Sequence, residues 1–340
     1  MDIMNKKPTQ KDVAKLANIS QSTVSQVINN PGSVNISEKT KTRVLEAILE
    51  LGYVPDKFAT GLRSGKSFCI AAVIPDIANP FYPPLLRGIQ DVARIHGYDL
   101  IIYDTHRKSE YEKQALKSLS NGYVDGAIVL LFHHEDKDLI PVIDLGLSVV
   151  SIRAEKPDGN DPVDNVYVDN IKNAQLAVRH LIKKGHKRIG LLSGLESTPP
   201  NVCREKGYRL ELQRNQIKII EKYIQASDFT EDGGYEGMKK LLKVSSNLTA
   251  VVAVDDLMAI GAMKAIKESG LKIPDDISIV GFDDIPAARL VTPTLTTMNG
   301  FQENIGKRAA MMLFDRIESS KEFKKRTLEL SAKLIVRDSS

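Results

Sequence analysis

The chain has 340 residues, of which 42% are hydrophobic and 26% charged, and this globular composition excludes a largely disordered chain. No apolar run approaches the roughly 20 residues that a membrane-spanning helix needs, and the sequence does not open with a signal-peptide pattern. The two cysteines, Cys69 and Cys203, match neither a disulfide framework nor a metal site. We therefore expect a cytoplasmic protein of two or three domains without membrane contact.

The net charge of +4 is concentrated at the start of the chain. Residues 1–66 contain ten basic and six acidic side chains, whereas the remainder contains 37 of each. A small basic unit joined to a large neutral one is typical of a nucleic-acid-binding module attached to a part with another role.

Three short helices are predicted within residues 1–55. Thr9 begins the first in a capping box, where a hydroxyl and an acid three residues later satisfy backbone N–H groups. Ser20 and Ser37 are the caps expected for the second and third helices, and Gly52 ends the third. Two helices joined by a tight turn form a helix-turn-helix, whose second helix lies in the major groove of DNA.

The outer face of the second predicted helix is polar and carries no acidic side chain. Short amides and hydroxyls bond base edges and phosphates, and a glutamine amide pairs bidentately with adenine. The alternative is a helical bundle with a polar exterior, but the charge distribution favours DNA binding. This face carries Gln21, Ser22, Ser25, Gln26 and Asn29.

Four motifs follow one another here: DVAKLA at 12–17, TVS at 23–25, VIN at 27–29 and LGYVP at 51–55. Together they resemble the headpiece of the lactose-repressor/galactose-repressor family of bacterial transcription factors. The resemblance implies a homodimer whose recognition helices lie in successive major grooves of a double-stranded inverted-repeat operator.

The same resemblance implies a hinge helix from about residue 56 to 64. One hinge helix from each subunit would enter the minor groove, with Leu62 as an apolar wedge between base steps. Beyond the face described above, the implied DNA contacts are Thr9, Ser20, Thr23, Lys57 and Leu62.

From Phe68 onward, short apolar runs alternate with amphipathic helical patterns. Alternating strands and helices predict parallel sheets covered by helices. Roughly 270 residues are more than a single hydrophobic core usually contains, so two α/β lobes separated by a cleft are expected. Ligands of such sheets bind at the carboxyl ends of the strands.

The resemblance continues through NPFY at 79–82, GYVDG at 122–126, GHKRIG at 185–190 and VGFDD at 280–284. It implies a three-helix headpiece and hinge helix, followed by a two-lobed periplasmic-binding-protein-like core of parallel sheets, with lobe crossings near residues 168, 298 and 326. The expected domains are the headpiece 1–55, the hinge and linker 56–66, and the core 67–340. Lobe 1 would comprise about 67–168 and 299–325, and lobe 2 about 169–298 and 326–340.

The family's effector pocket maps onto seven positions of this chain. Arg204 and Asp283 are expected to face each other across the cleft, with an aromatic face beneath a sugar ring. Arg153 adds a positive group, which favours an acidic or phosphorylated sugar over a neutral one. The implied effector-binding residues are Phe81, Tyr82, Arg153, Arg204, Phe229, Asp255 and Asp283.

Other functions are weighed against this one. No P-loop, dinucleotide fingerprint or nucleophile elbow is found, so catalysis, cofactors and metals are not expected. A solute-binding protein would share the two lobes but needs an export signal. A regulator controlled by a phosphorylated carrier protein remains an alternative. Residues 327–337 are expected to form a final strand without a following heptad tail, which favours a dimer over a tetramer.

Overall fold

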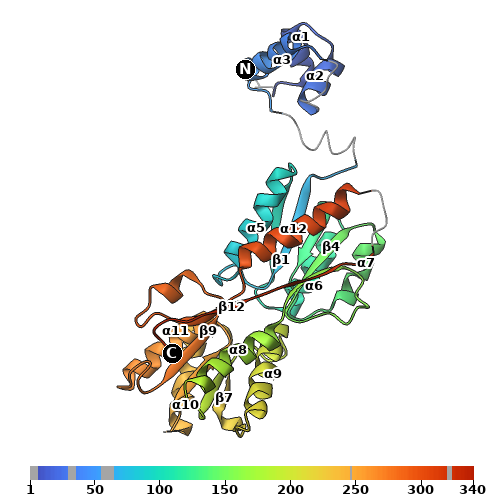
Figure 1. The fold of residues 1–340 in the computed structure, drawn as a ribbon. Coiled ribbons are helices and arrows are strands. Elements are labelled where there is room, and N and C mark those ends of the chain that lie inside the picture. The colour runs from blue at the N-terminus through green and yellow to red at the C-terminus, as the bar shows by residue number, and fades with distance from the viewer. Residues whose placement is uncertain (1–6, 30–35, 55–64, 246, 320–323) are drawn as a thin grey trace. The chain divides into compact units, whose positions relative to one another are not determined.

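The computed structural model describes residues 7–29, 36–54, 65–245, 247–319 and 324–340. The chain divides into two units, Met1–Ser67 and Phe68–Ser340 (Figure 1). The hinge segment predicted at 56–64, with Lys57 and Leu62, lies outside the described residues. Within the described part of the chain, no helix is long and apolar enough to cross a bilayer.

The described residues of the first unit form three helices, as predicted: α1 (Gln10–Ala17), α2 (Gln21–Asn29) and α3 (Glu38–Leu51). The Thr9 capping box is present, with the Thr9 backbone N–H donating to the Asp12 carboxylate at 2.8 Å. Gly52 ends α3 with φ of +60°, a conformation that glycine adopts without strain. The small core of this unit is centred on the buried side chains Val13, Val24, Val27 and Val44.

The second unit is built on two six-stranded sheets. We call the first sheet and its helices lobe 1. Helices α5 and α12 pack together on one face of this sheet, and α6 and α7 lie on the other. The strands, in spatial order, are β11 (Thr327–Leu330), β5 (Asp164–Val168), β4 (Ser148–Arg153), β3 (Gly126–Val129), β1 (Cys69–Ile74) and β2 (Asp99–Asp104). The helices are α5 (Tyr82–Ile95), α6 (Ser109–Leu119), α7 (Ile140–Asp144), α12 (Gln302–Glu318) and the 3₁₀ helix η1 (Asp136–Leu139).

Lobe 2 is the second sheet with its helices. Helices α8 and α9 pack together, as do α10 and α11. The strands, in spatial order, are β12 (Lys333–Ile335), β10 (Thr296–Asn299), β9 (Ser278–Phe282), β8 (Ala250–Ala253), β6 (Ile189–Ser193) and β7 (Ile224–Ala226). The helices are α8 (Asn170–Lys183), α9 (Pro199–Arg214), α10 (Glu231–Val244), α11 (Asp256–Glu268) and the 3₁₀ helices η2 (Glu221–Tyr223) and η3 (Pro286–Arg289).

The chain passes between the lobes at three places. It leaves lobe 1 between β5 and α8, and it returns between β10 and α12. The third crossing joins β11 to β12, so it lies between Leu330 and Lys333.

The expectation of one final strand over 327–337 within lobe 2 is therefore wrong. β11 pairs in parallel with β5 of lobe 1, whereas β12 pairs antiparallel with β10 of lobe 2. In Figure 1 this dark red segment runs along both lobes. One extended run serves as an edge strand of each sheet, and Ser331–Ala332 connect the two.

Candidate ligand cleft and DNA-binding surface

A cavity of about 730 Å³ lies between the two lobes. Its walls come from the carboxyl ends of β1, β3, β4, β8 and β9 and from the loops that follow them. This is the position at which parallel α/β sheets bind ligands. All seven residues predicted for the effector pocket line it, namely Phe81, Tyr82, Arg153, Arg204, Phe229, Asp255 and Asp283.

Arg204, on α9, is held by several partners at once. Its Nε donates to the Asn170 side chain at 2.7 Å, and Nη2 donates to Asp283 Oδ1 at 3.3 Å. A further N–H donates to the backbone carbonyl of Val254, and the guanidinium lies 4.6 Å from the centre of the Phe282 ring. The guanidinium is therefore fixed in orientation before any ligand arrives.

The sequence predicted that Arg204 and Asp283 face each other across the cleft, and this prediction is wrong. Both belong to lobe 2, because Asp283 directly follows β9, and they form an ion pair within that lobe. Burial raises the pKa of Asp283, and the neighbouring Arg204 opposes the increase. The pair presents a carboxylate and a guanidinium side by side, an arrangement that bonds adjacent hydroxyl groups.

Asp255 caps the start of α11 with one carboxylate oxygen, Oδ1, which accepts the Met258 backbone N–H at 2.7 Å. The other oxygen, Oδ2, is buried and makes no hydrogen bond within 3.5 Å among the described residues, although the Asn79 side chain lies close enough to the carboxylate to lower its pKa. Burial, reinforced by the negative charge of Asp283, raises the pKa of Asp255 to about 7. A buried acceptor without a partner is costly, so this oxygen favours a ligand that donates a hydrogen bond.

Arg153, at the end of β4, is not an available positive group. Its Nη1 donates to Asp136 at 2.8 Å and to Asp161 at 3.0 Å. Two carboxylates therefore balance one guanidinium, and Asp161 Oδ2 still lacks a partner among the described residues. The expectation that Arg153 favours an acidic or phosphorylated sugar is not supported by this arrangement.

Aromatic side chains supply the apolar part of the wall. Phe81 and Tyr82 lie at the start of α5, with ring centres 5.0 Å apart in an edge-to-face arrangement. Phe229, with φ of +63°, packs so closely on Gly194 that a Cβ there would lie 2.3 Å from its ring. Gly194 thus makes room for Phe229 beside the cavity.

The cavity also contains polar residues that sequence reasoning missed. Asp76 and Arg107 follow β1 and β2. Asp136 begins η1, Asp161 lies in the loop before β5, and Asn170 begins α8. Asp76 and Arg107 could have been found from their position after the carboxyl ends of predicted strands. Asp136 and Asp161 carried no such signal, because only the fold brings them to Arg153.

Most of the predicted DNA-binding face in the first unit is exposed where the structure describes it. Gln21, Ser22 and Gln26 are exposed on α2, which has no acidic residue in its sequence. Ser20 Oγ lies 2.8 Å from Thr23 Oγ1 and caps the helix by accepting the Thr23 backbone N–H at 3.1 Å. Thr9 is exposed as the cap of α1, Ser25 is half-buried, and α2 ends at Asn29.

Comparison with known proteins agrees with both units. Residues 9–56 match the bacterial regulatory proteins of the lacI family, and residues 178–340 match a periplasmic binding protein-like domain. Over 317 residues, the chain is 34% identical to the HTH-type transcriptional repressor CytR of Escherichia coli K12, and the match covers 91% of this chain and 90% of the relative. The chain belongs to the lacI family.

Two solved structures of transcriptional regulators are similar to this chain over nearly its whole length. The Lac repressor dimer bound to operator and the anti-inducer ONPF has a TM-score of 0.86 at 28% identity, covering 98% of this chain and 99% of that chain. The complex of the transcriptional regulator CelR with cellobiose has a TM-score of 0.73 at 31% identity, covering 98% and 100%. This lacI-family member is a DNA-binding transcriptional repressor with a ligand-binding core, and not an enzyme.

Proposed function

We propose that this repressor binds an inverted-repeat operator as a homodimer, and that a neutral sugar-like ligand in the cleft controls its affinity for DNA. The observation that carries the proposal is the cavity between the lobes, which all seven predicted effector residues line. Such a regulator of cellular DNA acts in the cytoplasm.

The first unit supports operator binding. Its surplus of basic residues attracts the phosphate backbone, and α2 presents exposed amide and hydroxyl groups of the kind that contact bases and phosphates. The related Lac repressor dimer was solved on its operator. On this proposal, the predicted contacts Lys57 and Leu62 act in the hinge segment.

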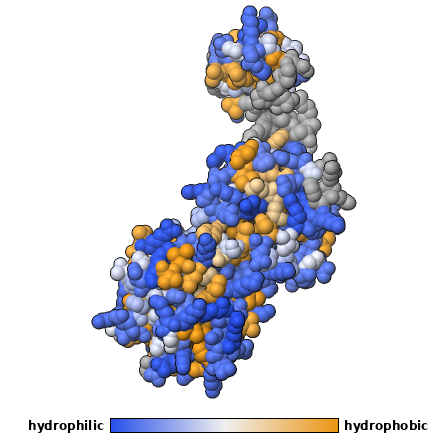
Figure 2. Space-filling model, viewed as in Figure 1, coloured by the Kyte–Doolittle hydropathy of each residue, from blue (hydrophilic) through white to orange (hydrophobic). Residues whose placement is uncertain are grey.

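Large exposed aliphatic residues on the second unit support the dimer. Figure 2 shows apolar side chains on the visible face of both lobes. The most exposed of them in the second unit are Ile95, at 82%, and Leu290, at 81%. A lasting interface needs apolar area of this kind at its centre, and a two-fold dimer would present two headpieces to an inverted repeat.

The charges of the cavity support a neutral ligand rather than an anionic one. Among its lining residues are eight Asp or Glu and five Arg or Lys. Arg204 and Arg153 are already paired with carboxylates, and Asp255 Oδ2 can accept a hydrogen bond from a ligand. A phosphate or carboxylate on the ligand would meet repulsion there, whereas sugar hydroxyls donate hydrogen bonds. The CelR complex with cellobiose provides an example of a neutral sugar in a related core.

A ligand screen followed by calorimetry tests the proposal. Neutral sugars, uronic acids, sugar phosphates and nucleosides are compared for their effect on the melting temperature of the full chain. The hit is then titrated into the parent, Arg204→Ala and Asp283→Ala, and operator binding is measured with and without it. We expect a neutral sugar as the hit and at least tenfold weaker binding to both variants, since each loses charge-assisted hydrogen bonds worth about 1.5 to 3 kcal/mol. A sugar phosphate as the hit, or unchanged affinity in both variants, would contradict the assigned ligand class or the assigned pocket.

A further inference from the structure

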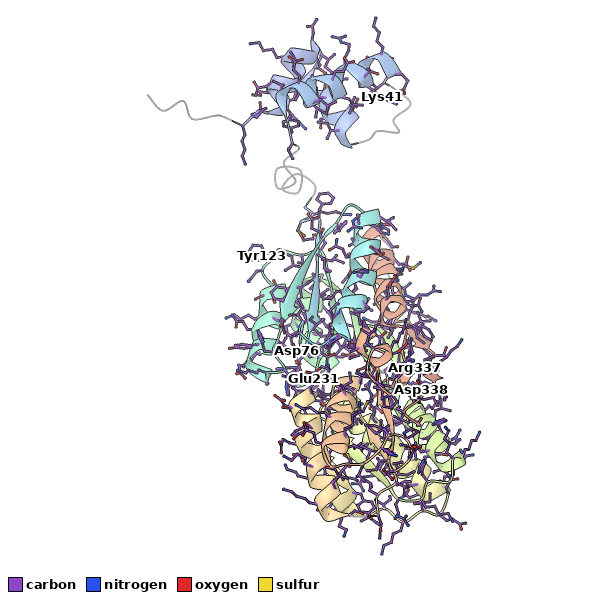
Figure 3. All side chains as sticks on the ribbon, turned by 90° about the vertical axis from the view of Figure 1, so that its left-hand side faces the viewer. Lys41, Asp76, Tyr123, Glu231, Arg337 and Asp338 are labelled. Atoms are coloured by element: carbon purple, nitrogen blue, oxygen red, sulfur yellow. The ribbon has the colours of Figure 1, made fainter. Side chains whose placement is uncertain are left out.

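The two lobes touch at a cluster of side chains that is separate from the three chain crossings. We call it the clasp and define it as Arg107, Phe132 and His133 of lobe 1 together with Asp228 and Phe229 of lobe 2. Asp76 is the lobe 1 partner of Arg107, and Glu231 follows the clasp in lobe 2. Figure 3 shows these two residues at one edge of the lobes. Arg337, which follows β12, lies at the opposite edge. A contact at the edge away from the crossings resists opening of the lobes with the longest lever arm.

Arg107 is fixed by lobe 1 on three sides. Its backbone N–H donates to the Pro75 carbonyl at 2.7 Å, and its own carbonyl accepts the His133 ring N–H at 2.9 Å. Its Nε lies 3.4 Å from an oxygen of Asp76. The residue has φ of +58°, a conformation that costs free energy for a side chain other than glycine. These contacts hold the strained backbone in place and aim the guanidinium toward lobe 2.

The guanidinium of Arg107 reaches lobe 2 directly. Its Nη1 donates to the backbone carbonyl of Asp228 at 2.5 Å. The receiving segment is itself ordered, since the Asp228 carboxylate accepts the Thr230 backbone N–H at 3.1 Å and the Thr230 hydroxyl at 2.6 Å. A charge-assisted hydrogen bond thus connects two segments that are each held within their own lobe.

An aromatic contact lies beside this hydrogen bond. The rings of Phe132 from lobe 1 and Phe229 from lobe 2 have centres 6.2 Å apart. The fully buried carboxylate of Glu112 accepts the backbone N–H groups of Phe132 and His133, each at 3.1 Å. Glu112 therefore holds the Phe132 loop, and His133 ties that loop to Arg107, so the lobe 1 side of the clasp forms one braced structure.

We propose that Arg107 is a positioning residue that holds the two lobes together over the cavity. Arg107, Phe132 and Phe229 all line that cavity. A ligand that contacts Phe229 therefore also acts on the residues that set lobe closure. The clasp adds a contact between the lobes at a place where the chain itself does not connect them.

The test measures the distance between the lobes without ligand or DNA, so its result does not depend on the proposed function. Nitroxide labels are placed on Glu110→Cys in lobe 1 and Lys240→Cys in lobe 2, both exposed positions, in a full-length Cys69→Ser, Cys203→Ser background. Double electron–electron resonance then gives the distribution of distances. We expect Arg107→Met, which keeps the apolar stem of the side chain, to add a longer-distance population that the parent lacks.

The neighbouring Lys108→Ala is the matched control. Lys108 is exposed, and its ammonium group lies 5.2 Å from the centre of the Tyr111 ring within its own lobe, so this variant should keep the parent distribution. Arg107→Lys should restore part of the closed population, because an ammonium group retains one donor for the Asp228 carbonyl. His133→Ala provides a second route, since it should loosen Arg107 and shift the distribution in the same direction. If both Arg107→Met and His133→Ala fold and keep the parent distribution, the clasp does not hold the lobes closed.

Discussion

The carboxyl group of Asp255 is buried at the base of the cleft, and its raised pKa has a measurable effect on stability. Because its pKa of about 7 in the folded chain exceeds the ordinary value of 3.8, the folded state binds more protons than the unfolded state between these pH values. Stability contributed by this group is therefore present at low pH and is lost as the pH rises toward 7.

Asp255→Asn should remove this loss while keeping a side chain that caps α11. We expect the variant to match the parent near pH 4 and to exceed it at pH 8, by on the order of 2 to 4 kcal/mol in the free energy of unfolding. Urea unfolding of the ligand-free protein at both pH values measures the difference. Asp169→Asn, which changes the aspartate cap of α8, serves as control and should gain nothing at pH 8. A variant that is no more stable than the parent at pH 8 would show that the ionised carboxylate of Asp255 does not destabilise the folded state.

Gln26 is exposed on α2 and is the residue expected to read a base. Its amide pairs with adenine, whereas an arginine at the same place pairs with guanine. Gln26→Arg should change the preferred base at one position of each half-site by about 1 to 3 kcal/mol. Selection of operators from a random DNA pool with both proteins measures this change, and identical consensus sequences would refute the assignment.

In the pocket, the sequence predicts which residues line the cavity but not which charged groups they pair with. The positions of Asp255 and Asp283 after their strands, and of Arg204 on α9, follow from the family resemblance. Their charge environment does not, because it depends on partners such as Asp136, which is 17 residues from Arg153 along the chain. Pairing of Arg153 with Asp136 and Asp161 is a property of the folded chain, so the sequence could not show that this guanidinium is already paired with carboxylates.

At the scale of elements, Asp164 connects the start of β5 with α12 and with the residue that precedes β11. It lies on β5 and is fully shielded, with hydrogen bonds from Arg316 on α12 and from Arg326, which leads into β11. Burial raises the pKa of Asp164, but the hydrogen bonds from the two arginines outweigh burial and lower it below the ordinary value of 3.8. The stabilisation is therefore complete above that value and is lost as the pH falls through the lower, folded-state pKa.

Asp164→Asn should destabilise the second unit by about 3 kcal/mol at neutral pH, because it leaves two guanidinium groups beside a neutral amide. The deficit relative to the parent should shrink as the pH falls below about 4, because the unfolded parent then takes up a proton on Asp164 while the folded parent does so only at its lower pKa. Denaturant unfolding at pH 7 and at pH 3 measures both effects. Asp315→Asn is the matched control, since the Asp315 side chain is 59% exposed while it pairs with Arg326, and it should cost at most about 1 kcal/mol. Equal losses in the two variants would mean that burial of Asp164 adds nothing.

The final strands illustrate the limit of prediction for elements. Alternating strands and helices correctly predicted two lobes of parallel sheet, since hydrophobic periodicity reports which faces are buried. The segment 327–337 has extended character throughout, and nothing in its local pattern states which sheet it joins. The choice is made by pairing partners distant in sequence: β5 for β11 and β10 for β12. The family resemblance implied a third crossing near residue 326, before β11, whereas these pairings place it after β11.

At the scale of the whole molecule, the division between residues 67 and 68 separates the two activities that this repressor combines. The second unit contains both sheets, the cavity and the exposed apolar residues proposed for dimerisation. The first unit contains the basic surplus and α2. A chain of residues 68–340 should therefore remain a dimer and bind the cleft ligand with the affinity of the full chain.

The same truncated chain should have no measurable affinity for the operator selected with the full chain. Residues 1–67 alone should bind that operator 10²- to 10⁴-fold more weakly than the full chain, by the order of magnitude expected when two linked modules no longer engage together. Sedimentation measures the oligomeric state, calorimetry measures ligand affinity, and fluorescence anisotropy on a labelled operator measures operator affinity. A truncated core that sediments as a monomer would place the dimer contact in the first unit. If residues 1–67 bound as tightly as the full chain, the second unit would not be needed to hold two headpieces on one operator. A ligand in the cleft could then not control DNA affinity in the proposed way.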